Sequence, residues 1–309
     1  NQFDHVGELD FFEVLADVKK RYTVDDDRIY LNGYSMGGHG TYRLAVRYPD
    51  LFAAIAPVAG WTYYQEFVPR WYERGVNPML PPIDLITPNR RPYYIDPSRK
   101  ANYEVAGALD WAENLMHLPS RIAYGTSDTT NQPENQEWLI AALDRFGYDN
   151  YVEVRLAGGH GAGDNKPEII AFFDGKTRVV NPTEMVYTTH RLKYGGAYWL
   201  KIDALRTTNG WARVAGRVNQ QTVSVSTIDV SGIVIDFARC PVDDKTGNLS
   251  IIIDGHFAYD GRLADLPESA RDGDTAGFEA VFDDQSYRLT GWRPRTAAAG
   301  GLKKTATRE

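Results

Sequence analysis

Leu31-Asn32-Gly33-Tyr34-Ser35-Met36-Gly37-Gly38 places a serine between two glycines, one two positions before it and one two positions after it. Residues 28–31 form a short apolar segment typical of a strand, and a helix is expected after Gly38. This is the G-x-S-x-G pattern of a nucleophile elbow, a strained turn from a strand into a helix. Side chains at positions 33 and 37 would collide with neighbouring backbone, so both glycines are expected to relieve the turn.

The elbow also predicts chemistry at Ser35. The turn would lift the serine hydroxyl clear of the sheet, and the helix would direct free N–H groups, including that of Met36, at an anionic oxygen formed beside it. Glycine and serine are common residues, so a structural serine in a glycine-rich turn is the alternative. Whether Ser35 is catalytic or structural therefore depends on the strand and helix around the turn, and on acidic and histidine partners farther along the chain.

Helices and strands alternate in the first 60 residues. A helix is expected over residues 8–22, a strand at 28–31 and a helix that ends near residue 48. Residues 52–60 are almost continuously apolar, which suits a parallel strand covered on both faces. This order is typical of a doubly wound, mostly parallel α/β sheet. The first helix places apolar residues at helical spacing: Leu9, Phe12, Leu15, Ala16 and Tyr22.

Residues 61–117 break this pattern with a segment dense in aromatic residues and prolines. A long insertion in a compact domain is usually functional, as a lid or pocket wall, although packing of its aromatic side chains over the sheet is an equal alternative. We expect Trp61 and Tyr63 from this segment, together with Tyr34 of the elbow, to contact the substrate.

Two further polar residues follow predicted strands. The strand at 120–125 leads to Asp128, and the strand at 151–156 leads to His160 within Gly158-Gly159-His160-Gly161. A helix is expected between these strands, over residues 133–146. Asp128 and His160 therefore lie at the carboxyl ends of strands, where an open α/β sheet binds its ligands.

Taken together, the elbow, Gly125-Thr126-Ser127-Asp128 and the glycine-flanked His160 resemble the α/β-hydrolase superfamily. Within it they are similar to the prolyl-oligopeptidase-like and phospholipase/carboxylesterase-like serine hydrolases, over about residues 1–175. The resemblance implies that Ser35 is the nucleophile, His160 the general base and then acid, and Asp128 the group that holds the imidazole. It also implies that the Met36 N–H provides one contact to the oxyanion.

The chain departs from this superfamily ahead of the elbow. Only about 30 residues precede Ser35, whereas the fold places several strands there, and a loop after one of them supplies the second oxyanion N–H. The elbow strand would have an unpaired apolar edge, which proteins avoid. We therefore expect the early strands to be missing from this chain and to lie in a separate or removed segment or on a second chain.

Other assignments stay open for several residues. Asp128 could cap the helix that follows it, with Asp110 or Asp164 as the catalytic acid. His160 could be a surface loop histidine, and His39 could line the site or lie on the surface of its helix.

The composition excludes several classes of protein. Hydrophobic residues at 43% and charged residues at 24% are ordinary for a globular protein, and no apolar run approaches the length of a membrane span. The net charge of -7 and the lack of a long basic run argue against a nucleic-acid partner. A single cysteine, Cys240, excludes an internal disulfide, and we expect it to be buried.

No metal or other cofactor is expected, because the remaining histidines lack partners at ligand spacing. The chain opens on Asn1-Gln2-Phe3 without a visible secretory segment, which is also compatible with a mature or cut polypeptide. The location stays open, with an extracytoplasmic one favoured over the cytoplasm.

The sequence predicts two domains and a tail. Residues 1–175 would form the hydrolase domain, and residues 176–295 contain short β-rich segments divided by turns, typical of an all-β sandwich. This second domain could shield the site, bind a polymer or hold protomers of a homo-oligomer together. Residues 296–309 have the composition of a disordered tail.

The resulting hypothesis is a serine hydrolase that cleaves carboxylic esters through an acyl-enzyme. The aromatic insertion favours an apolar or aromatic group in a small or polymer-linked ester. A peptidase of prolyl-oligopeptidase type is the alternative within the same chemistry. From another class, the alternative is a non-catalytic module that binds carbohydrate or protein on a hydrolase scaffold.

Overall fold

The computed structural model describes residues 6–62, 107–162, 166–207, 210–265, 271–272 and 275–279, the last two ranges as backbone only. Tyr63, Asp164, most of the 61–117 insertion and the 296–309 tail lie outside these ranges. The predictions made for them stay predictions.

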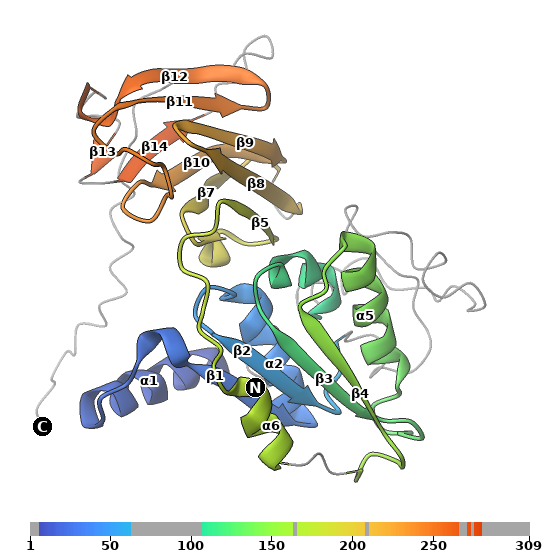
Figure 1. The fold of residues 1–309 in the computed structure, drawn as a ribbon. Helices are drawn as coiled ribbons and strands as arrows, with labels where there is room; N and C mark the ends of the chain where they lie inside the picture. The colour runs from blue at the N-terminus through green and yellow to red at the C-terminus, as the bar shows by residue number, and fades with distance from the viewer. Residues whose placement is uncertain are drawn as a thin grey trace, which may run out of the picture.

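A four-stranded parallel sheet forms the centre of the first part of the chain (Figure 1). It consists of β1 (Tyr30–Tyr34), β2 (Ala54–Val58), β3 (Ser120–Gly125) and β4 (Tyr151–Leu156), in the order β1-β2-β3-β4. Strands β2 and β3 are buried along their whole length, as their continuous apolar sequences predict. The predicted α/β class and parallel pairing are confirmed.

Helices cover both faces of this sheet. On one face, α2 (Met36–Arg47), α5 (Glu134–Phe146) and the 3-10 helix η3 (Leu109–Leu115) pack in one core with Ile55 and Ile122. On the other, α6 (Lys166–Phe173) packs Ile169 against the neighbouring strand positions, Ala56 and Ala123. Since successive side chains of a strand point to opposite faces, the two cores follow from the sequence of β2 and β3. The short 3-10 helix η1 (Asp26–Arg28) leads into β1.

Helix α1 (Val6–Arg21) is less buried than its apolar spacing predicts. Phe12 makes an edge-to-face contact with Tyr48, but the side chains of Leu9 and Tyr22 are 57% and 68% exposed. The buried side chain of the first turn is instead an acid, Glu8, at 1% exposure. Leu9, which the helical spacing assigns to the apolar face, is therefore exposed, and so is Tyr22, which follows the last residue of α1.

Residues 184–279 form two five-stranded sheets, in the orders β12-β11-β9-β8-β5 and β13-β14-β10-β7-β6. Their apolar side chains pack in a single core, which includes Trp199, Ile235, Ile251 and the buried Cys240. Six of these strands overlap the β-rich segments that the sequence indicates, at 186–189, 197–202, 222–226, 232–237 and 249–253, whereas β8, β12, β13 and β14 were not predicted. The strands are β5 (Glu184–Thr189), β6 (Gly196–Ala197), β7 (Leu200–Leu205), β8 (Ala212–Asn219), β9 (Thr222–Ile228), β10 (Val230–Asp236), β11 (Asn248–Ile253), β12 (His256–Arg262), β13 (Arg271–Asp272) and β14 (Thr275–Glu279), with 3-10 helices η4 (Leu192–Tyr194) and η5 (Leu263–Asp265).

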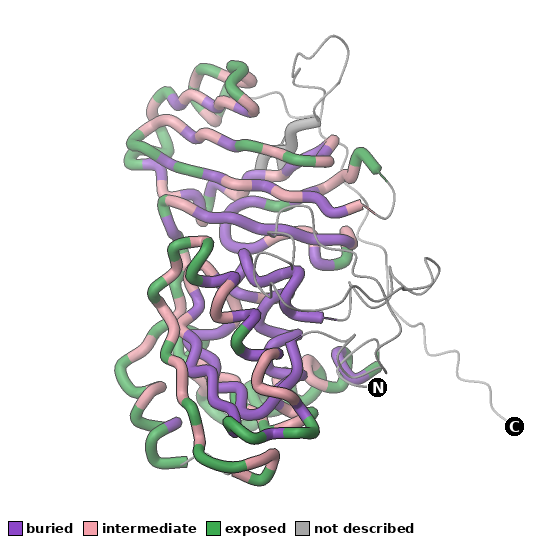
Figure 2. The backbone as a smooth tube through the Cα atoms, turned by 90° about the vertical axis from the view of Figure 1, so that its right-hand side faces the viewer, coloured by how far each residue is buried: buried purple, intermediate pink, exposed green. Residues whose placement is uncertain are grey.

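Buried polar contacts join the β-rich part to the parallel-sheet part. Asn114 of η3 accepts a hydrogen bond from Thr188 N at 2.7 Å and donates one to Thr188 O at 2.9 Å. The Tyr187 hydroxyl donates to Arg47 O at the end of α2. Figure 2 shows buried segments in both parts, on either side of this junction. The two parts are thus connected through η3 and through the end of α2, the helix that begins at the elbow.

None of the helices in the described ranges is long and apolar enough to cross a membrane.

Candidate active site

Ser35 lies at the junction of β1 and α2, as the elbow pattern predicts. Its backbone φ is 55°, in a region that non-glycine residues rarely adopt and that costs about 1–3 kcal/mol. The first helical hydrogen bond runs from His39 N to Ser35 O at 3.0 Å. The N–H of Met36, the first residue of α2, therefore has no partner within the helix.

Close backbone packing explains two glycines near the elbow. A Cβ at Gly33 would lie 2.2 Å from the carbonyl oxygen of Gly37, and one at Gly38 would lie 2.6 Å from Val58 O on β2. A Cβ at Gly37, by contrast, would meet no described atom within 4 Å. The steric reason given above for Gly37 is therefore wrong, and the close contact of α2 with the sheet depends on Gly38 instead.

This difference predicts opposite results for two alanine substitutions. Gly33→Ala is expected to lower the free energy of unfolding by about 2–4 kcal/mol, because backbone at the elbow must move to admit the new Cβ. Gly37→Ala is the matched control, and its stability should be unchanged or higher because alanine is favoured over glycine in a helix by about 1 kcal/mol. Chemical denaturation followed by circular dichroism measures both. Equal stabilities of the two variants would contradict this packing.

The structure brings Ser35, His160 and Asp128 together from the ends of three strands. Ser35 Oγ lies 2.8 Å from His160 Nε2, and His160 Nδ1 lies 2.7 Å from Asp128 Oδ2. A carboxylate only accepts hydrogen bonds, so Nδ1 carries a hydrogen and Nε2 is free to accept the serine hydroxyl hydrogen. The Asp128 side chain is fully buried, whereas that of His160 is 25% exposed.

The second carboxylate oxygen of Asp128 is also engaged. Its Oδ1 accepts hydrogen bonds from the backbone N–H groups of Thr130 and Asn131, at 2.8 and 2.9 Å. The cap position of α5 is occupied by Pro133, and no side chain makes a capping bond there. Asp128 therefore stabilises the turn after β3 and not the helix, while its other oxygen remains directed at His160. Asp110, the alternative acid, lies in η3.

The loops after β3 and β4 pack closely, which fixes His160 relative to Asp128. Ser127 N donates to Gly158 O at 2.8 Å, and Gly158 has a φ of 130°, which favours glycine. A Cβ at Gly125 would lie 2.4 Å from Gly159 O. The Tyr34 hydroxyl donates to His160 O. Gly125 and Gly158 thus allow the two loops to pack closely enough to hold His160 next to Asp128.

Of the predicted substrate-contacting residues, Tyr34 is the most accessible one in the described structure. Its side chain is half exposed, and its ring centroid lies 5.4 Å from that of His160. Trp61 is 4% exposed and stacks on His39 at 4.3 Å, and His39 Nδ1 donates to Trp61 O. His39 is fully buried, so a surface position for it is wrong.

Two buried amides that the sequence did not single out hold the loop after β2. Asn131 Nδ2 donates to Ala59 O at 2.6 Å, and Gln136 Nε2 donates to Gly60 O. Ala59 has a φ of 46°. No local pattern indicates these contacts, because asparagine and glutamine near a helix start usually face solvent.

Comparison with known proteins places these residues in a family. A model of the prolyl oligopeptidase family matches residues 5–174. The cutinase est2 of Thermobifida alba is 33% identical over 117 residues, which are 35% of this chain and 37% of the cutinase. The poly(3-hydroxyalkanoate) depolymerase C of Paucimonas lemoignei is 36% identical over 147 residues, which are 47% of this chain and 32% of the depolymerase. The chain thus spans about a third of the length of these two relatives.

Similar solved structures include the acylaminoacyl peptidase of Pyrococcus horikoshii, with a TM-score of 0.40 and 18% identity over 55% of this chain and 27% of the peptidase. A thermostable esterase aligns with a TM-score of 0.35 and 21% identity over 56% of this chain and 38% of the esterase. The family match covers more than half of the chain and contains all three hydrogen-bonded residues. The chain belongs to the prolyl oligopeptidase family.

Proposed function

We propose that this protein hydrolyses carboxylic esters through an acyl-enzyme formed on Ser35. The observation that carries the proposal is the continuous hydrogen-bonded series from Ser35 Oγ through the His160 imidazole to Asp128. A nucleophile, a base and a group that orients the base are thus within hydrogen-bond distance of one another. A non-catalytic binding module has no need for this arrangement, which argues against that alternative.

In the proposed reaction, Ser35 Oγ attacks the carbonyl carbon of the ester while its proton passes to His160 Nε2. Asp128 stabilises the resulting imidazolium through the Nδ1 hydrogen. The former carbonyl oxygen becomes an oxyanion and accepts a hydrogen bond from the Met36 N–H. His160 then donates the proton to the leaving alcohol, and the acyl group remains on Ser35.

Water completes the cycle. His160 removes a proton from a water molecule as that water attacks the acyl carbonyl, and the second tetrahedral intermediate releases the acid. The proton on His160 returns to Ser35 Oγ. No cofactor enters these steps.

The relatives favour an ester over a peptide bond. Besides cutinases and a polyhydroxyalkanoate depolymerase, they include a bifunctional acetylxylan esterase/xylanase of Neocallimastix patriciarum. These names describe esters that are part of a polymer or attached to one, and we propose the same class of substrate here. The peptidase remains the second candidate, because the family takes its name from one.

A comparison of kcat/KM for short aryl esters and for prolyl peptides tests this choice. We expect turnover of the esters to be favoured by at least about a hundredfold, which corresponds to about 2.7 kcal/mol in transition-state binding. A preference for the peptides would contradict the ester assignment and support the second candidate.

We also propose that a further strand pairs with β1 in the active assembly. Among the described residues, β1 pairs only with β2. At the start of β1, a groove of about 610 Å³ is lined by Tyr30 and by Phe173 and the exposed Ile170 of α6, and Val14 of α1 is also exposed. An added strand would pair the backbone groups of the edge and cover these apolar side chains. The same segment would supply the second oxyanion donor.

Light scattering combined with an esterase assay tests this proposal. The 309-residue chain alone should turn over esters more slowly than an assembly that carries the pairing segment. Undiminished turnover by a monomer of this chain would contradict it.

A further inference from the structure

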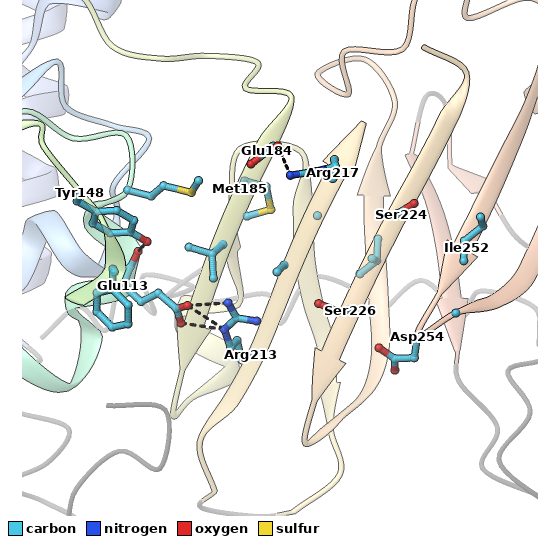
Figure 3. A pocket seen from close by; sticks show the side chains of 17 residues that line it. Glu113, Tyr148, Glu184, Met185, Arg213, Arg217, Ser224, Ser226, Ile252 and Asp254 are labelled. Atoms are coloured by element: carbon cyan, nitrogen blue, oxygen red, sulfur yellow. Dashed lines mark hydrogen bonds and ion pairs between the residues drawn. The ribbon is translucent and has the colours of Figure 1, made fainter. Parts of the chain in front are cut away.

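A cavity of about 670 Å³ lies at the junction of the two parts of the molecule and is lined by residues of both (Figure 3). Its floor is the outer face of β5, β8, β9 and β11. One end is closed by Phe146, the last residue of α5, and Tyr148, which lies between α5 and β4. This end is therefore at the amino ends of the parallel strands, whereas Ser35, Asp128 and His160 are at their carboxyl ends. The cavity is not part of the candidate active site.

Strand register makes the floor a groove that crosses the sheet. Val186, Ala215 and Ser226 are paired in register and form a row of small side chains. Larger side chains line both sides of this row, with Arg213 on one side and Arg217 and Ile252 on the other. At about 4.8 Å between strands, the groove from β5 to β11 is about 14 Å long. It can therefore hold an extended chain of several linked units.

Both arginines of the groove are paired with carboxylates. Arg213 makes two parallel contacts with the Glu113 carboxylate, at 2.6 and 2.9 Å, and Arg217 lies 2.6 Å from Glu184. The dashed lines in Figure 3 mark both pairs. The Asp254 carboxylate accepts hydrogen bonds from the backbone N–H and the hydroxyl of Thr227. Asp254 is the third carboxylate of a lining that has two arginines, so an anionic polymer would find no excess of positive charge.

The same groove offers hydrogen-bonding groups and ring faces. Among the described residues, no protein group hydrogen-bonds to the hydroxyls of Ser224 or Ser226, which both line the cavity. Phe146 and Tyr148 have ring centroids 5.5 Å apart, and the Tyr148 hydroxyl donates to Glu113 O, which fixes its ring. Oriented polar groups beside aromatic rings suit a ligand with both hydroxyls and C–H faces.

We propose that this groove binds a neutral polysaccharide chain. Sugar rings present hydroxyls to Ser224, Ser226 and the two ion pairs, and their C–H faces to Phe146 and Tyr148. Their lack of charge suits a groove whose two arginines are already paired with carboxylates. Because the groove and the triad lie at opposite ends of the parallel strands, binding here holds the enzyme on a polymer without occupying the catalytic serine. The proposal does not depend on which bond the enzyme cleaves.

Affinity electrophoresis of the full chain tests the proposal. The gels contain galactomannan, arabinoxylan, mixed-linkage β-glucan or amylose, with polygalacturonate as the anionic comparison. We expect retardation by at least one neutral polysaccharide, little changed by 0.5 M NaCl because the contacts are not between net charges. Ser226→Trp should fill the groove and weaken the apparent affinity by about tenfold or more.

Two controls separate occupancy of the groove from damage to the fold. Asn219→Trp adds the same side chain to the same outer face but outside the cavity, and it should bind like the unaltered protein. Ser224→Ala combined with Ser226→Ala should weaken binding, whereas Ser250→Ala should not, since Ser250 donates to Asp260 outside the cavity. Thermal unfolding verifies that all variants are folded. No retardation by any neutral polysaccharide, equal retardation of Ser226→Trp, or retardation by polygalacturonate alone would each overturn the proposal.

Discussion

Replacing Ser35 with alanine is expected to lower kcat for ester hydrolysis by about four to six orders of magnitude while substrate binding stays nearly intact. The change removes the oxygen that attacks the carbonyl, and with it the acyl-enzyme. The backbone N–H of Met36 and the surrounding packing are unaffected. Steady-state kinetics with an aryl ester measures kcat, and calorimetric titration with a product acid measures binding.

Combination with a second substitution sharpens this test. His160→Ala should reduce kcat by a similar factor, and the double variant should be little slower than either single one, because groups that act as a unit are not additive. If Ser35→Ala keeps more than about one per cent of the activity, another nucleophile performs the reaction. Multiplicative losses in the double variant would mean that Ser35 and His160 act independently, against the proposed mechanism.

Replacing Glu8 with alanine is expected to lower the free energy of unfolding by about 3–5 kcal/mol. The Glu8 carboxylate lies 3.0 Å from Arg47 Nη1 and accepts hydrogen bonds from the hydroxyls of Tyr48 and Tyr194, both at 2.6 Å. Lys193 Nζ is 2.7 Å away. Removal of the carboxylate leaves the Arg47 guanidinium buried without this partner. These contacts connect α1, the end of α2 and the β-rich part. Their loss is therefore expected to lower the stability of the whole fold.

Urea denaturation of Glu8→Ala measures this effect, with Glu13→Ala as the control. Glu13 is exposed on the same helix, and its replacement should change stability by no more than about 0.5 kcal/mol. Equal effects of the two substitutions would contradict the importance of the buried carboxylate.

The pKa of Glu8 adds a pH dependence to the same experiment. Burial alone would raise this pKa, but hydrogen bonds from Lys193, Tyr194 and Tyr48 and the charge of Arg47 lower it below the ordinary 4.5. The stability that the carboxylate contributes is therefore present above about pH 4.5 and is lost as the pH falls through the lower pKa of the folded state. The Glu8→Ala variant should lose less stability than the unaltered protein on acidification through this range.

The sequence predicted the parts of the fold that depend on local patterns. Strands β3 and β4 have the predicted bounds, 120–125 and 151–156, because apolar or alternating residues end there at turn residues. Helix α5 begins one residue later than predicted, at Glu134. The meeting of Ser35, Asp128 and His160 followed from their positions after parallel strands, whose carboxyl ends share one edge of the sheet.

Long-range packing accounts for what the sequence did not predict. An acidic residue in an amphipathic helix is ordinarily solvated, and Glu8 is buried only because its partners come from residues 47–48 and 193–194. Gly33 has no room for a side chain whereas Gly37 has, and this difference depends on how α2 packs against the sheet. Strand β8 is the exception, because buried and more exposed residues alternate along it as in any half-buried strand. Its local sequence was therefore sufficient to predict it.

Labelling of the purified chain with a fluorophosphonate probe, followed by peptide mass spectrometry, tests the central claim most directly. Such a probe reacts with a serine only when a neighbouring base activates it. We predict a single adduct on Ser35, absent in Ser35→Ala and strongly reduced in His160→Ala. A folded protein that gives no adduct, or an adduct on another serine, would contradict the assignment of Ser35 as the activated nucleophile.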